Sequence, residues 1–124
     1  MNARKLASQK KDLARIYKRL GESLQKEKTD EVRDSVIKRF ELCTDAFWKT
    51  LQSILEEEYG KALASPKPVI RQAIVEGLIP PDERYIAIID LRNELVHNYH
   101  EEFADQAYGA IRDYAPLFAT LASQ

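Results

Sequence analysis

Residues 29–60, TDEVRDSVIKRFELCTDAFWKTLQSILEEEYG, decide the fold of this chain. Thr29 or Asp30 can cap the start of a helix, and Gly60 is a typical stop. Between them, apolar side chains recur at helical spacing, in a stripe wide enough to contact more than one neighbouring helix. The stripe consists of Val32, Val36, Phe40, Cys43, Phe47, Leu51 and Ile54, widened by Ile37, Trp48 and Leu55. At about 1.5 Å per residue this helix would reach roughly 45 Å.

Two further helices are predicted next to this one along the chain. The first covers roughly residues 2–26, where leucines at helical spacing alternate with lysines and arginines. The second is short, because Ser65 and Pro66 form a typical helix start and Gly77 ends the pattern.

Beyond an apolar connector at residues 78–81, the pattern predicts a helix that opens at Pro81 or Asp82, and a last one over about 100–122 that Pro116 kinks or breaks. No segment alternates with a period of two, so no sheet is expected. The sequence therefore predicts an all-α fold, a single domain over 1–124. It would be an antiparallel up-and-down bundle of four long helices plus one short helix.

Composition excludes several classes of protein. The chain of 124 residues has one cysteine, Cys43, so no internal disulfide forms; its place on the core stripe predicts an inert buried thiol in a reducing cytoplasm. No apolar run approaches the roughly 20 residues of a membrane span, and residues 1–11 lack the apolar core of a secretion signal.

The net charge of −1 hides an asymmetry. Residues 1–28 carry nine Lys and Arg against three Asp and Glu, whereas residues 29–124 carry ten against seventeen. The basic part could attract nucleic acid or an acidic partner. Alternatively, it is a solvated helix face that packs near the acidic remainder.

One segment, residues 92–100 (RNELVHNYH), carries the chemistry. At 100° per residue, Tyr85, Ile88, Ile89, Val96 and Tyr99 fall on one side of the predicted helix, with Arg92 among them. A guanidinium is costly to bury without an anion. Its partner is expected to be either a carboxylate of this chain, Glu41 or Asp45, or a phosphate from outside it.

The chain resembles the HEPN domains, most closely the small bacterial ones once named nucleotidyltransferase substrate-binding subunits. The resemblance rests on Arg39-Phe40-Glu41 and Phe47-Trp48-Lys49, on Ala73 with Gly77-Leu78-Ile79, and on Arg92-Asn93 followed four residues later by His97 and then Tyr99. Relatives often carry Trp several positions before this motif, where residues 84–86 read Arg-Tyr-Ile. We interpret that difference as a core substitution that leaves the chemistry in place.

The resemblance implies a homodimer that brings two such helix ends into one cleft, and a ribonuclease toxin that cleaves RNA without metal. Arg92 and His97 would be the catalytic residues, assisted by Asn93. It also implies a partner, a small nucleotidyltransferase antitoxin, that adds AMP to the Tyr99 hydroxyl. No cofactor is expected, because no glycine-rich loop is present to hold nucleotide phosphates.

The chemistry fits these residue types. Histidine can act as acid or base near neutral pH, and the planar guanidinium suits phosphate oxygens. Five residues of helix rotate a side chain by about 500°, so Arg92 and His97 point roughly 140° apart. One copy cannot easily aim both at one phosphate, whereas two copies at a two-fold axis can.

Other interpretations remain open at this stage. The same cleft could hold a nucleotide or phosphorylated substrate in a non-catalytic subunit of a two-component nucleotidyltransferase, or the chain could be a purely structural dimerising bundle. His97 and Tyr99 could simply be a satisfied histidine and a packed ring at a helix end, although we expect Tyr99 to be partly exposed. His97 and His100 invite a metal site, but no third His or Cys has suitable spacing, and no metal is expected.

Overall fold

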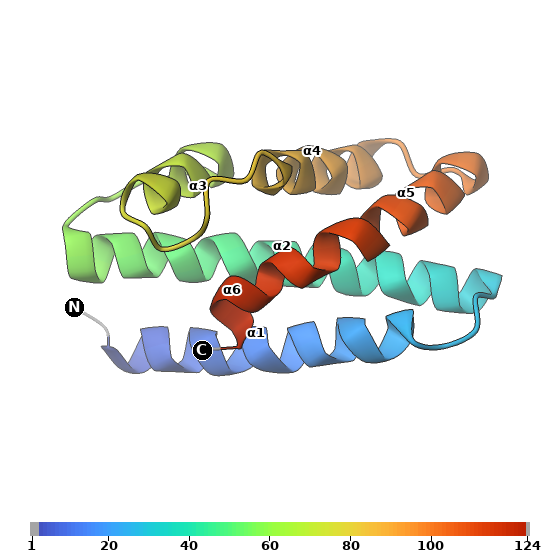
Figure 1. Cartoon of the computed structure of the whole chain (residues 1–124), viewed down its shortest axis with the longest axis horizontal. Helices are drawn as coiled ribbons and strands as arrows, with labels where there is room; N and C mark the ends of the chain where they lie inside the picture. Colours follow the sequence, from blue (N-terminus) through green and yellow to red (C-terminus); the bar gives the residue numbers. More distant parts are fainter. Residues whose placement is uncertain (1–2, 124) are drawn as a thin grey trace.

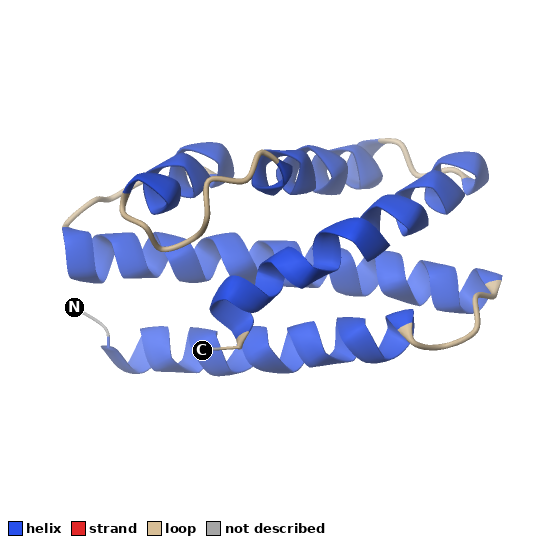
Figure 2. Cartoon of the chain, viewed as in Figure 1, coloured by secondary structure: helices blue, strands red, loops and turns tan. Residues whose placement is uncertain are grey.

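The computed structural model describes residues 3–123, and all of its regular structure in that range is helical (Figure 2). The elements are α1 (Ala3–Leu24), α2 (Asp30–Tyr59), α3 (Pro66–Val75), α4 (Arg84–His97), α5 (Glu101–Tyr114), a 3₁₀ turn η1 (Ala115–Phe118) and α6 (Ala119–Ala122). Successive long helices run antiparallel, and α3 lies at the end of the bundle against α2 and α4 (Figure 1). The predicted all-α bundle is confirmed.

Helix α2 is the central element, because α1, α3, α4 and α5 all pack against it. Its boundaries are those that the sequence predicts. The Thr29 hydroxyl accepts a hydrogen bond from the Val32 amide (3.1 Å), and Gly60 adopts the left-handed conformation, with φ of 65°. The apolar stripe of α2 is buried except at Val32 and Trp48, which are half-buried.

The other helix ends differ from the predictions by a few residues. Helix α1 ends at Leu24, and the expected start at Asn2 lies outside the described residues. Helix α4 begins at Arg84 rather than at Pro81 or Asp82, because the Asp82 carboxylate accepts hydrogen bonds from the Arg84 amide (2.9 Å) and guanidinium. The last predicted helix is interrupted, and the break falls in η1, around Pro116.

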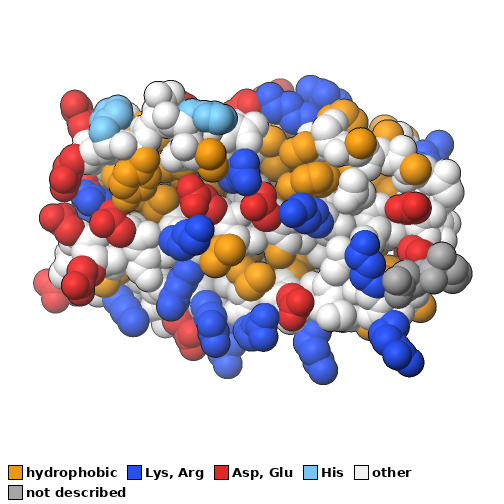
Figure 3. All heavy atoms as spheres, turned by 180° about the vertical axis from the view of Figure 1, so that it is seen from behind, with side chains coloured by type: hydrophobic (Ala, Val, Ile, Leu, Met, Phe, Trp, Pro, Cys, Tyr) orange, Lys and Arg blue, Asp and Glu red, His pale blue; other side chains and the backbone are white. Residues whose placement is uncertain are grey.

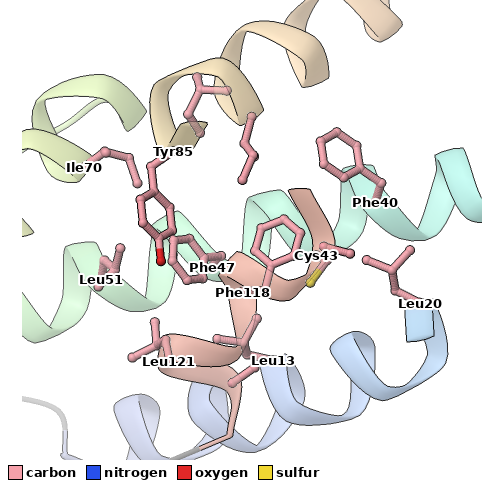
Figure 4. Packing of buried hydrophobic residues seen from close by; sticks show 14 of the residues in the cluster. Leu13, Leu20, Phe40, Cys43, Phe47, Leu51, Ile70, Tyr85, Phe118 and Leu121 are labelled. Atoms are coloured by element: carbon pink, nitrogen blue, oxygen red, sulfur yellow. The ribbon is translucent and has the colours of Figure 1, made fainter. Parts of the chain in front are cut away.

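Tyr85 connects α4 to the centre of the core (Figure 4). Its ring stacks on Phe47, with centroids 5.7 Å apart and planes within 4°, and Phe47 meets Phe118 edge-on at 5.3 Å. The Tyr85 hydroxyl donates to the Leu117 carbonyl oxygen (2.9 Å), and burial raises its pKa. Tyr85 is therefore a core residue, as predicted for the stretch in which relatives often carry Trp. Its contacts position α4 against α2.

The side of α4 predicted for Val96, shared with the buried Tyr85, is wrong. Val96 is 52% exposed, whereas Leu95 is buried. Residues 88 and 95 are seven positions apart, close to two full turns, so Leu95 continues the row begun by Ile88. Val96 lies about 100° further round the helix, and Tyr99 lies beyond its end.

Candidate functional site between α2 and α4

Arg92 reaches from α4 towards α2 and pairs with a carboxylate of its own chain. Its Nη2 donates a hydrogen bond to Asp45 Oδ2 (3.2 Å), its Nη1 donates to Asn93 Oδ1 (3.3 Å), and its Nε lies 3.2 Å from Asp45 Oδ1 without a hydrogen bond. Of the two predicted acids, Asp45 is the partner. The side chain is still 32% exposed. Asp45 therefore orients the guanidinium, and N–H groups remain for an anion from outside.

His97 and Asn93 lie on another side of α4. The helix is continuous from Arg84 to His97, so the rotation of roughly 140° between Arg92 and His97 applies. Asn93 and His97 are one turn apart, and both are exposed. The structure brings Arg92 and Asn93 together, but within one chain it does not direct His97 and Arg92 at a common point.

Tyr99 follows the end of α4, in the short segment 98–100 that leads into α5. Its hydroxyl donates a hydrogen bond to Asp34 Oδ1 on α2, at 2.6 Å. Burial and this hydrogen bond raise the pKa of Tyr99 to about 12, and the same hydrogen bond lowers the pKa of Asp34. Tyr99 is about half exposed, as predicted. The carboxylate that holds it could not be inferred from sequence.

Arg33, which the sequence interpretation missed, anchors this segment. Its side chain is 5% exposed and contacts four carboxylates: Asp34 and Glu101 at 3.0 Å, Asp105 at 3.2 Å and Asp30 at 3.6 Å. These contacts raise its pKa, led by the hydrogen bond to Glu101. A signal for it exists, because Arg33 precedes the buried Phe40 by seven residues and so lies on the core stripe.

A cavity of about 130 Å³ lies beside Arg92, at the junction of α2, α4 and the start of α3. It is lined by Thr44, Asp45, Trp48 and Lys49 of α2, by Ile89, Arg92 and Asn93 of α4, and by Pro66 of α3. A wider depression further along the same two helices is lined by Asp34, Ile37, Lys38, Glu41, Leu95, Val96 and Tyr99. Both hollows are lined by residues of α2 and α4, and we refer to the two together as the α2–α4 groove.

The surface around this groove mixes apolar and charged side chains. Figure 3 shows the side of the molecule opposite to α5, with both histidines along its upper edge, apolar side chains below them, and basic side chains gathered along its lower edge over α1. Leu42 and Val96 are the large aliphatic residues of α2 and α4 that are more than one-third exposed.

Two other predictions concern Cys43 and the histidines. Cys43 is fully buried and burial raises its thiol pKa, so the predicted inert thiol is confirmed. His100 caps α5, since its Nδ1 accepts a hydrogen bond from the Phe103 amide at 3.3 Å.

Within residues 3–123, no group of three or more His, Cys, Asp or Glu side chains could hold a metal ion, and no helix is long and apolar enough to cross a membrane.

Comparison with known proteins gives a family and a related structure. Residues 4–124 match the family described as "nucleotidyltransferase substrate binding protein like". A crystal structure of a protein from Thermus thermophilus is similar to the chain, with 35% sequence identity and a TM-score of 0.81, covering 90% of this chain and 96% of that one. No protein with a curated description matches.

Proposed function

The chain belongs to the nucleotidyltransferase substrate binding protein-like family, and from that premise we propose that it is a metal-independent endoribonuclease toxin that acts as a homodimer. A nucleotidyltransferase encoded as its partner would silence it by adding AMP to Tyr99. The observation that carries the proposal is the state of Arg92: a guanidinium one-third exposed beside a surface cavity, held by a single carboxylate and by Asn93.

RNA cleavage needs a base, an acid and a cation, and this site offers a candidate for the cation and for one of the two proton transfers. The ribose 2′-OH loses its proton to a base and its oxygen attacks the adjacent phosphorus, while the bond to the 5′ oxygen breaks and an acid protonates that oxygen. The products are a 2′,3′-cyclic phosphate and a free 5′-OH. His97 would serve as the acid or the base, since imidazole titrates near neutral pH. Arg92 would offset the charge that develops on the phosphorane, and Asn93 would position Arg92.

The geometry of α4 supports a dimer. Because Arg92 and His97 leave the helix on different sides, one phosphate can be reached by both only if they come from two subunits. Val96, which lines the groove, and Leu42 of α2 are exposed and would supply apolar surface for such pairing. RNA would approach a basic protein surface, since Arg4, Lys11, Arg15 and Lys18 are exposed on α1.

Modification of Tyr99 would silence the site through charge and bulk. The hydroxyl is at the surface, and its oxygen would attack the α-phosphorus of ATP, releasing pyrophosphate and leaving AMP on Tyr99. The added phosphate lies in the groove that contains Val96, where it would obstruct pairing and repel RNA. Tyr99→Phe should cleave RNA like the parent but escape silencing by the partner enzyme.

A second function is favoured by the family description. The chain could be the non-catalytic subunit of a two-component nucleotidyltransferase, with the groove holding the substrate for its partner. In that case the protein would bind nucleotide or substrate without cutting RNA. The difference is measurable, because a subunit of this kind leaves total RNA intact with or without a chelator.

The test is RNA cleavage by purified protein in the presence of EDTA. The parent should cleave, His97→Ala should not, and His100→Asn, which keeps an N-cap acceptor on α5, should cleave like the parent. Mixing Arg92→Lys with His97→Ala chains should then restore activity, to about a quarter of the parent level if dimers form at random, because one site of each mixed dimer is intact. Parent-level cleavage by His97→Ala, or no cleavage by the parent, refutes the proposal.

A further inference from the structure

The cavity beside Arg92 is lined by two residues that each carry a buried polar atom without a hydrogen-bond partner, and of the two only Arg92 Nε has a charged neighbour, Asp45 Oδ1 at 3.2 Å. Across residues 3–123 there are three such side-chain atoms: Gln9 Oε1, Thr44 Oγ1 and Arg92 Nε. Thr44 and Arg92 both line this one cavity. Buried polar groups are nearly always paired, and each exception in a native structure calls for a physical reason. Thr44 is 1% exposed, so its unpaired hydroxyl carries a desolvation cost that a bound polar ligand would relieve.

The side chains around these atoms define the class of ligand. Trp48 offers a half-buried indole face, and Lys49 Nζ lies 6.0 Å from the centre of that ring. Arg92 and Lys49 bring two positive charges to the rim, against the single carboxylate of Asp45. An aromatic face with adjacent cations is the arrangement that binds unstacked bases and their phosphates.

The size of the cavity limits the ligand to one ring system at a time. Its volume is about 130 Å³, slightly below the roughly 150 Å³ of a dry cavity that binds benzene, so a single base would fill it and extend beyond its mouth. Asn93 lines the cavity and is itself exposed, one turn before the exposed His97 on α4. A base held inside would therefore place its own phosphate near the entrance.

We propose that this cavity is a nucleotide-binding pocket that takes one unstacked base of the RNA against Trp48, with the phosphate of that nucleotide on Arg92 and Lys49. The inference rests on the proposed ribonuclease, for which it supplies the substrate contact that positions one nucleotide at the cleavage site. Thr44 would contribute its hydroxyl once Arg92 moves from Asp45 towards the phosphate. The pocket also explains why Arg92 is held by only one carboxylate.

Trp48 provides the measurement, because it is the only tryptophan in the chain. Its fluorescence is titrated with the four nucleoside 5′-monophosphates, with the corresponding nucleosides and with inorganic phosphate. Monophosphates should change the emission saturably, nucleosides should bind more weakly, and phosphate should compete without changing the emission itself. Lys49→Gln and Arg92→Lys should each weaken the binding of the monophosphates, whereas Lys61→Gln, a control just beyond the end of α2, should not.

The stacking contact is tested separately. Trp48→Leu should weaken the binding of labelled monophosphate in equilibrium dialysis by roughly 5- to 100-fold, the range expected for loss of one base–aromatic stack. Trp48→Phe keeps an aromatic face and should retain most of the affinity, which guards against a folding defect in the Leu variant. Equal binding by the Leu, Phe and parent proteins overturns the proposal.

RNA cleavage measured on the same preparations separates the two hypotheses. Saturable binding that depends on Lys49 and Trp48, with no cleavage, refutes the nuclease and leaves a nucleotide pocket. Cleavage without a change in Trp48 emission at millimolar nucleotide overturns the pocket and leaves the nuclease. Nucleosides that bind as tightly as monophosphates also overturn it, because the phosphate contacts would then be absent.

Discussion

Two arginines of this chain face carboxylates across helix contacts, and their surroundings differ sharply. Arg33 is buried and contacts Asp30, Asp34, Glu101 and Asp105 within 3.6 Å, whereas Arg92 is one-third exposed and pairs with Asp45 alone. Arg33 has more acidic neighbours than it needs for charge balance, and it joins the starts of α2 and α5. Arg92 has one acid and a neighbouring cavity, so a second anion can still be accommodated.

The comparison separates a structural arginine from one available for binding. Charge balance around Arg33 is complete within the chain, so an external phosphate would gain little there. Around Arg92 the carboxylate and the amide of Asn93 use only part of the guanidinium. This difference predicts that variants of Arg92 lose activity and variants of Arg33 lose stability.

Replacing Arg92 should abolish activity and leave the fold intact. Arg92→Lys keeps the charge but loses the planar fork, and we expect RNA cleavage to fall by about 100-fold or more, the scale of losing one transition-state donor. The melting temperature should change little, because partly exposed ion pairs contribute little to stability. Arg71→Lys, a change at an exposed arginine of α3, is the matched control. Parent-level cleavage by Arg92→Lys would mean that the guanidinium is not needed for the reaction.

Replacing Arg33 should have the opposite effect. Arg33→Met removes the cation from among four carboxylates, which then repel one another across the contact between α2 and α5. We expect the melting temperature to fall by several degrees, measured by circular dichroism. Below that temperature, nucleotide-dependent quenching of Trp48 should persist. An unchanged melting temperature would mean that the four carboxylates are satisfied by water alone.

The sequence could predict the scaffold but not the ion-pair site around Arg33. Residues 29–60 carry local signals, a Thr cap, a stripe with helical spacing and a Gly stop, and each acts within a few residues. Arg33 was overlooked because a charged residue near the start of a helix is usually solvent-facing, and its position on the core stripe gains meaning only when Glu101 and Asp105 are placed beside it. These partners are about 70 residues away along the chain.

In the candidate site, too, local features were predictable and distant partners were not. The motif residues Arg92, His97 and Tyr99 could be selected by resemblance, and the dimer requirement followed from helix geometry. Their partners could not, since Asp45 and Asp34 are chosen by how α2 and α4 cross. Val96 was assigned to the wrong side because a single residue of offset moves a side chain by about 100°.

The Tyr99–Asp34 hydrogen bond should be visible in pH titrations. The Tyr99 pKa is raised to about 12, so its contribution to stability is complete below the ordinary tyrosine pKa of about 10 and is lost as the pH rises from there to about 12. The Asp34 pKa is lowered, so its contribution is present above about pH 4 and is lost as the pH falls further.

The Asp34→Asn variant separates these effects. Tyr99 should then ionise closer to its ordinary pKa of about 10, seen in the ultraviolet absorbance of tyrosinate as the difference from the same variant carrying Tyr99→Phe. The acid limb of the stability curve should also flatten. An unchanged high pKa for Tyr99 would mean that burial alone, and not the carboxylate, keeps the hydroxyl protonated.

Replacing Asp45 should have a small effect on stability, and it tests the difference between Arg33 and Arg92 most directly. Asp45→Asn leaves an amide oxygen that can accept from Arg92 but removes the one carboxylate beside it. Because the pair is about one-third exposed, stability should change by less than about 1 kcal/mol. Affinity for nucleoside monophosphates should rise several-fold, since Arg92 no longer has to leave an anion to bind a phosphate. Glu94→Gln, on the exposed side of α4, makes the same charge change away from the cavity and should leave the affinity unchanged. If Asp45→Asn weakens nucleotide binding instead, the carboxylate is needed to orient the guanidinium. Arg92 would then depend on its acidic partner, as Arg33 does, although it has only one.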